Sequence, residues 1–170
     1  MAQAFVFPDI SLISDPILSM TELALEKIPK PIVALDLGNK RVGVAVSDDL
    51  HISIRPLPPL KRSNWKQLLS DVESLIKSFD AEAIVLGLPL RLDGTPGTAA
   101  AEVERLGRNF SKSLKVPVYF QDERLTSFEA RQQLISKGHT EEEIGTLIDG
   151  EAAVLILRDF LSSETTHPAL

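Results

Sequence analysis

"PIVALDLGNKRVGVAVSDD", residues 31–49, decides the fold, because it joins two apolar runs and places one charge inside the first. The two runs are rich in β-branched residues, and the short turn "GNK" between them predicts a β-hairpin. Asp36 lies between Leu35 and Leu37, where an unpaired buried charge would be costly. A cation, a metal ion or a set of hydrogen bonds must therefore compensate it. The alternative is a carboxylate that bonds the turn at Gly38 and Asn39.

The chain downstream alternates between strand and helix patterns. The run "ISIRPLPPL" predicts a third strand near a sheet edge because prolines interrupt it, and Asn64 with Gln67 predicts the start of an amphipathic helix. The nearly continuous apolar run "AEAIVLGLPL" is typical of a strand buried on both faces. A helix with Val103, Leu106, Phe110 and Leu114 on one face follows, and then a fifth strand, "VPVYFQDERLTS". The order predicts an α/β fold, a mixed five-stranded sheet with an antiparallel start, a parallel continuation and helices on its faces.

Helix patterns close the chain. Residues 128–137 predict a helix that Gly138 ends, and Thr140 with Glu143 offers a capping box for the next one. The stretch "IDGEAAVLILRDFL" predicts a further helix, apolar nearly all round, with Asp149 at the head of its inward face. We expect an N-terminal extension over residues 1–30, a single domain over 31–162 and a C-terminal tail over 163–170.

Composition narrows the class of protein. The 170 residues contain no cysteine, which excludes disulfides and thiolate metal sites. No run approaches the roughly 20 apolar residues that cross a bilayer, and no secretory signal pattern opens the chain, so we expect a cytoplasmic protein without a membrane partner. The net charge of -6 argues against general affinity for nucleic acid, but a local basic patch remains open. Its candidates could equally be scattered solubilising charges; they are Lys40, Arg41, Arg55, Lys61, Arg62 and Arg91.

Three acids are predicted to converge: Asp36 from the first strand, Glu123 from the end of the fifth and Asp149 from the last helix. Strand alternation sends Asp122 and Glu123 to opposite faces, so only one should point into a given site. Carboxylate oxygens suit Mg²⁺ or Mn²⁺, whereas zinc would call for His or Cys. A pair of such ions could activate water and stabilise the leaving oxygen of a phosphodiester. Asp48 and Asp49, at the far end of the hairpin, are expected to be exposed turn acids.

Four motifs in this order, "LDLGNKRVGVAVSD", "VLGLPLRLDGT", "QDERLTSFEA" and "IDGEAAVLIL", closely resemble the YqgF family, whose members are called pre-16S rRNA nucleases and Holliday junction resolvase-like proteins. The match covers residues 32–162. The resemblance implies an RNase H-like fold and a metal-dependent nuclease with Asp36, Glu123 and Asp149 as metal ligands and Asp122 as a further site acid. It also implies that Lys40, Arg41, Arg91 and Arg124 hold the nucleic-acid backbone.

The implied function is processing of the 5′ end of a ribosomal RNA precursor, with hydrolysis that leaves a 5′ phosphate. Three alternatives stay open: a junction-cleaving DNA endonuclease acting on branched DNA, a non-catalytic RNA-binding factor in ribosome assembly, and a member of the sugar-kinase, actin and Hsp70 superfamily. That superfamily shares the acid and glycine of the first hairpin but needs more than twice this length. The sequence leaves the oligomeric state open.

Overall fold

The computed structural model describes residues 31–123 and 126–162. These residues form five strands, as predicted, and four helices, in the order β-β-β-α-β-α-β-α-α. The strands are β1 (Ile32–Leu37), β2 (Arg41–Ser47), β3 (Ile54–Lys61), β4 (Ala83–Leu88) and β5 (Val118–Asp122). The helices are α2 (Trp65–Phe79), α3 (Thr98–Leu114), α4 (Thr126–Ser136) and α5 (Glu141–Ser162). The predicted extension over 1–30 and the tail over 163–170 lie outside the described residues.

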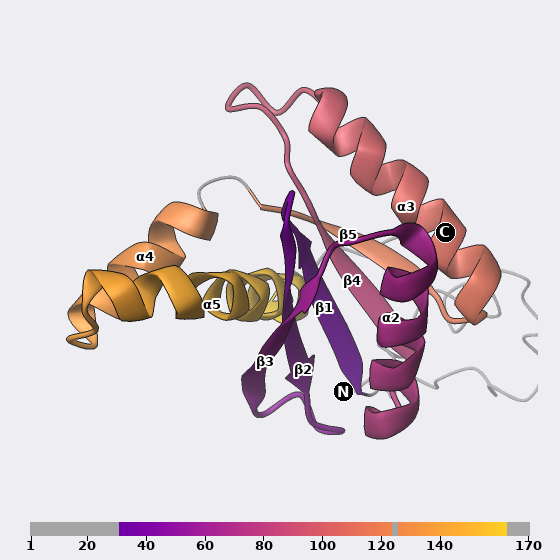
Figure 1. Ribbon diagram of the computed structural model, residues 1–170, viewed down its shortest axis with the longest axis horizontal. Helices are drawn as coiled ribbons and strands as arrows, with labels where there is room; N and C mark the ends of the chain where they lie inside the picture. Colours follow the sequence, from indigo (N-terminus) through magenta and orange to yellow (C-terminus); the bar gives the residue numbers. More distant parts are fainter. Residues whose placement is uncertain (1–30, 124–125, 163–170) are drawn as a thin grey trace, which may run out of the picture.

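The strands form one mixed sheet in the order β3-β2-β1-β4-β5. The first three are antiparallel neighbours, and β4 and β5 continue parallel to β1, which confirms the predicted topology. The proline-containing β3 is an edge strand, as expected. Because β1, β4 and β5 run in the same direction, their carboxyl ends meet at one edge of the sheet (Figure 1).

The two faces of the sheet are packed differently. Helices α2 and α3 cover one face, where large side chains such as Leu35, Leu86 and Phe110 are buried. Helix α5 crosses the other face (Figure 1), and several strand residues beneath it are small, including Ala34, Ala45 and Ala83. The predicted helices on both faces are therefore confirmed. The small residues let α5 lie close to the strands.

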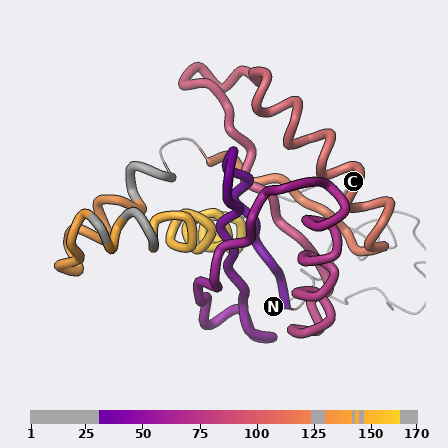
Figure 2. Tube along the Cα trace, in the orientation of Figure 1, coloured from indigo at the N-terminus to yellow at the C-terminus, as the bar shows by residue number. Residues whose placement is uncertain are grey.

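The last helix differs from the prediction. The sequence favoured a helix starting at the Thr140 capping box and a separate one over residues 148–161, but α5 is continuous from Glu141 to Ser162. Gly150 lies within this helix and faces β3, where little room is left for a side chain. A Cβ added there would lie 3.0 Å from Cβ of Pro56. Asp149 is consequently in the middle of α5 rather than at its head. Figure 2 shows the C-terminal part of α5 in yellow, beside the indigo strands of the first hairpin.

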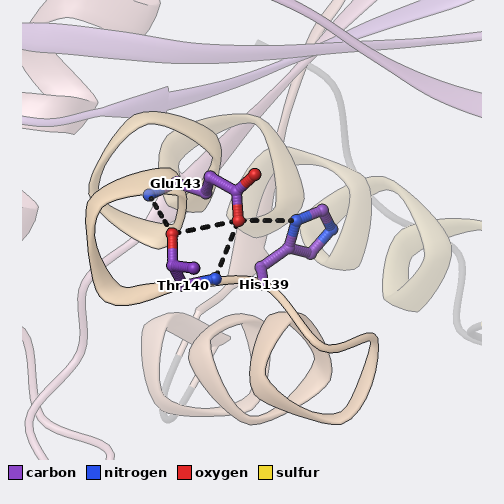
Figure 3. Close-up of polar contacts among 3 residues, drawn as sticks. All are labelled: His139, Thr140 and Glu143. Atoms are coloured by element: carbon purple, nitrogen blue, oxygen red, sulfur yellow. Dashed lines mark hydrogen bonds and ion pairs between the residues drawn. The ribbon is translucent and has the colours of Figure 1, made fainter.

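The capping box that starts α5 is formed as predicted (Figure 3). The backbone N–H of Thr140 donates to Oε2 of Glu143 at 2.8 Å, and the backbone N–H of Glu143 donates to Oγ1 of Thr140 at 3.4 Å. The backbone hydrogen bond from Thr140 lowers the pKa of Glu143, with the Thr140 hydroxyl adding to it. His139 Nδ1 lies 3.7 Å from the same Glu143 oxygen. These contacts fix the start of α5 outside the sheet.

Two other predicted helix ends are also confirmed. Oδ1 of Asn64 accepts the backbone N–H of Gln67 at 3.0 Å and caps α2. Gly138 follows α4 with a φ of +83°, a conformation that favours glycine. Within residues 31–123 and 126–162, no helix has the length and apolar character needed to cross a membrane.

Candidate functional site

The first predicted acid, Asp36, points to the α5 face of the sheet. It follows the alternation of Ile32 and Ala34, which pack on that face, and its antiparallel partner on β2 is Gly43. Burial, and to a smaller extent the charge of Asp149, raise the pKa of Asp36 to about 6. The structure therefore places Asp36 beside Asp149, under α5, and its contact with the turn is through its backbone carbonyl, which accepts the N–H of Gly38 at 3.0 Å.

The second acid, Glu123, follows the end of β5 and turns over β4. Its backbone N–H donates to the carbonyl of Leu88 at 3.2 Å, which continues the strand pairing by one step. A Cβ added to Gly87 would collide with Oε2 of Glu123 and lie 2.6 Å from Cδ1 of Ile156 in α5. Burial raises the pKa of Glu123 to about 8, with added repulsion from Asp36 and then Asp122. Glu123 thus shares the α5 face with Asp36.

The third acid, Asp149, is carried by α5 onto the first hairpin. A Cβ added to Gly43 would collide with the backbone oxygen of Asp149 and lie 2.6 Å from its carbonyl carbon. Its side chain, 23% exposed, forms an ion pair in which Arg41 Nε lies 2.7 Å from Oδ2. The structure therefore brings all three predicted acids to the edge where β1, β4 and β5 end.

Two unsatisfied oxygens mark the same place. In the part of the chain that the structure describes, the buried side-chain N and O atoms without a hydrogen-bond partner are Oε1 of Gln121 and Oδ2 of Asp149. The contact of Oδ2 with Arg41 is thus an ion pair without hydrogen-bond geometry. Gln121 is the β5 partner of Gly87, so it alternates onto the α5 face with Glu123. Buried polar groups are normally satisfied, so Oε1 of Gln121 indicates a missing partner, whereas Oδ2 of Asp149 is compensated by Arg41 alone.

A divalent cation suits this donor set. Asp36, Glu123, Asp149 and Gln121 supply only oxygen atoms, the ligands that Mg²⁺ and Mn²⁺ prefer. The raised pKa values of Asp36 and Glu123 show that their negative charges are poorly compensated by the protein itself. Among the described residues, no three acids or histidines are already arranged as a ligand set. Arg41 is the positive group that Asp149 contacts in this structure.

Other acids of the chain do not join these three. Asp122 pairs with Leu88 in the sheet register and alternates away from α5, although its charge contributes to the raised pKa of Glu123. Asp48 is an exposed turn acid, as expected: Oδ1 accepts the backbone N–H of Ile52 at 2.8 Å. Glu151 points toward α4, where Lys137 Nζ lies 2.6 Å from Oε1.

The predicted cations lie in three places. Lys40 and Arg41 lie at the β1–β2 turn, beside the acids. Arg91 is exposed in the loop that follows β4, at the same edge of the sheet. Arg55 is excluded from this group, because its guanidinium stacks 5.1 Å from the ring centroid of Phe79. Arg124 lies outside the described residues.

Sequence reasoning missed Gly43, Gly87 and Gln121. The glycines were detectable, because each interrupts a β-branched or apolar strand run, a pattern that often marks a close approach of another backbone or a ligand. Their missing side chains make room for the Asp149 backbone and the Glu123 carboxylate. Gln121 gave no signal in the sequence, since its role depends on burial.

Known proteins resemble this chain in sequence and in fold. A family model described as "RuvX: Holliday junction resolvase" matches residues 30–163. A Syntrophomonas wolfei protein, "Putative pre-16S rRNA nuclease", is 41% identical over 76% of this chain and 92% of its own, and a Syntrophus aciditrophicus protein of the same name is 38% identical over 78% and 88%. The structure "T. thermophilus RuvC in complex with Holliday junction substrate" matches with a TM-score of 0.53 and 15% identity, covering 83% of this chain and 99% of that one.

The structural match supports the RNase H-like, resolvase-type fold that the resemblance implied. The family match sets aside the sugar-kinase, actin and Hsp70 alternative and assigns the activity to the nuclease class. The chain belongs to the RuvX family, the Holliday junction resolvase-like proteins also known as YqgF.

Proposed function

We propose that this protein is a metal-dependent nuclease that hydrolyses a phosphodiester bond in the 5′-end processing of a pre-16S rRNA. Asp36, Glu123 and Asp149 are the proposed metal ligands, with Mg²⁺ or Mn²⁺ as the ion. The observation that carries the proposal is the convergence of these acids under α5, with Oδ2 of Asp149 and Oε1 of Gln121 buried and unsatisfied. Such a role would place the protein in the cytoplasm.

Divalent ions bound to such carboxylates supply activation of a water and neutralisation of charge on the leaving oxygen. The protein's own contribution begins with proton release, because Asp36 and Glu123 must lose their protons before they can bind a cation. Oε1 of Gln121 is proposed to accept a hydrogen bond from a water in the site. Lys40, Arg41, Arg91 and Arg124 are proposed to hold backbone phosphates. Water adds across the P–O bond, the 3′ oxygen leaves with a proton, and the other product keeps a 5′ phosphate.

Two substrates are supported by different comparisons. The names of the Syntrophomonas and Syntrophus relatives favour an rRNA precursor. The family description favours a four-way DNA junction, which makes a junction-cleaving endonuclease the second candidate. A non-catalytic RNA-binding factor is the outcome that remains if neither substrate is cleaved.

The test offers both substrates to the same protein. A labelled rRNA precursor and a labelled four-way junction are incubated with Mn²⁺ and with EDTA. We expect the parent protein to cleave the precursor only with Mn²⁺, with Asp36→Asn inactive and Asp49→Asn, the same change in an exposed turn acid, fully active. Cleavage of the junction alone would transfer the assignment to DNA, and Mn²⁺-independent or absent cleavage of both would reject the proposal.

A further inference from the structure

A basic depression lies beside the three acids. Its volume is about 560 Å³, and five residues line it: Lys40, Arg41, Lys61, Arg62 and Ser63. Four of the five carry a positive charge, in a chain whose net charge is -6. Two of them, Lys61 and Arg62, come from the end of β3 and the loop after it, 14 and 15 residues after the last residue of β2, Ser47.

The backbone holds these cations together. Arg41 and Lys61 are cross-strand partners on β2 and β3. The backbone N–H of Arg62 donates to the carbonyl of Lys40 at 3.0 Å, and Nη1 of Arg62 donates to the carbonyl of Gly38 at 2.9 Å. Arg62 also pairs with Glu102 at the start of α3. Its side chain therefore serves to hold the β1–β2 turn against β3 and α3.

The two lysines supply charge that the described part of the protein does not neutralise. Lys40 and Lys61 are exposed, and no acid whose side chain the structure describes forms an ion pair with either. Holding two lysines next to Arg41 and Arg62 is electrostatically unfavourable unless an anion binds between them. The hydroxyl of Ser63 adds a hydrogen-bond donor to the same depression.

Arg41 connects the depression to the acids, because it lines the depression and contacts Oδ2 of Asp149. An anion bound by the lysines would therefore be adjacent to the place where the acids converge. A nucleic-acid backbone carries its phosphates at regular intervals, so one phosphate can occupy the depression while a neighbouring one lies at the acids. We propose that Lys40, Arg41, Lys61, Arg62 and Ser63 form a subsite for a backbone phosphate that flanks the scissile one.

This inference rests on the proposed nuclease function, and the experiment separates the two. Binding of labelled rRNA precursor and four-way junction is measured in EDTA, where no metal-dependent cleavage occurs, over a range of salt concentrations. The variants are Lys40→Ala and Lys61→Ala. The control is Lys112→Ala, an exposed lysine ten residues along α3 from Glu102.

Each lysine that contacts a phosphate contributes about 1 to the slope of log affinity against log salt. We expect Lys40→Ala and Lys61→Ala each to lower the slope by about 1, and Lys112→Ala to leave it unchanged. Unchanged slopes in both variants, with a parent protein that still cleaves, would overturn the subsite alone. Lowered slopes with a parent that never cleaves would keep the subsite and overturn the nuclease function. Inorganic phosphate is the competitor at matched ionic strength: if it binds while the nucleic-acid slopes stay unchanged, the depression is a free-phosphate site and the backbone subsite is rejected.

Discussion

The two faces of the sheet are packed in opposite ways, one by large side chains and the other by close approach of a helix backbone. On the α2 and α3 face, large side chains such as Leu68, Leu86 and Phe110 fill the space between helix and strand. On the α5 face, Gly43 and Gly87 leave no side chain, and the helix backbone and a carboxylate come into that space. The first face is built for stability. The second gives up side-chain packing so that charges from β1, α5 and the end of β5 can meet.

A side chain added between the sheet and α5 should have the largest effect on the free energy of unfolding. Gly43→Val inserts a side chain where the Asp149 backbone lies, and we expect a loss of more than about 3 kcal/mol in the free energy of unfolding, at the upper end of overpacking effects. The free energy of unfolding of Gly43→Ala should lie between that of Gly43→Val and that of the parent protein. Urea unfolding measures both.

The matched variant on the opposite face is Leu68→Ala. It should lower the free energy of unfolding by about 2–5 kcal/mol, because it leaves a cavity. Thermal unfolding with and without Mn²⁺ then distinguishes the faces. Leu68→Ala should keep the Mn²⁺-induced rise in Tm, and Gly43→Ala should lose it. A Gly43→Ala protein with a full Mn²⁺ response would show that close approach of α5 is not needed for the site.

Removing a charge from the α5 face should stabilise the metal-free protein. The pKa of Glu123 is raised from 4.5 to about 8, so between these values the folded protein retains a proton that the unfolded chain has released. Stability therefore falls as pH rises from 4.5 to 8, and the penalty is complete above pH 8. Glu123→Gln should be more stable than the parent on the order of 2–3 kcal/mol at pH 8.5, with little difference at pH 4.

Glu73→Gln provides the comparison from the α2 and α3 face, because Glu73 is exposed on α2 and pairs with Lys77. We expect its stability to track the parent at both pH values. Chemical unfolding in EDTA at pH 4 and pH 8.5 measures all three proteins. Equal stability of Glu123→Gln and the parent at pH 8.5 would mean that the Glu123 charge is already compensated.

The fold was largely predictable from local patterns, because strand alternation, helix caps and glycine stops act over a few residues. Asn64, Thr140 and Gly138 each perform the predicted local role. The continuity of α5 was not predictable, because the capping box at Thr140 and the apolar run from Ile148 gave two separate helix signals. Asp36, Glu123 and Asp149 could be chosen as unusual acids in apolar settings, whereas Gln121 and Lys61 join the site through burial and strand pairing alone.

Arg41 should compete with the metal for Asp149. Its guanidinium lies 2.7 Å from Oδ2, so the metal must displace it or share the carboxylate with it. We expect Arg41→Gln to bind Mn²⁺ about tenfold more tightly, a change of about 1.4 kcal/mol, in calorimetric titration. Arg108→Gln on α3, which breaks a surface pair with Glu104, should leave Mn²⁺ affinity unchanged. Weaker Mn²⁺ binding by Arg41→Gln would instead show that Arg41 supports the ligand geometry.

The smallest effect should come from the caps, which lie outside the packed faces. Thr140→Ala at the start of α5 and Asn64→Ala at the start of α2 should each lower the free energy of unfolding by about 1 kcal/mol at pH 7. The Thr140→Ala penalty should shrink as pH falls through the lowered pKa of Glu143, because the stabilising carboxylate is then protonated. Urea unfolding at pH 7 and pH 3 measures both variants. If the sheet positions α5, Thr140→Ala must keep the full Mn²⁺-induced rise in Tm. A lost Mn²⁺ response would mean instead that the cap, and not the contact with Gly43, sets the position of Asp149.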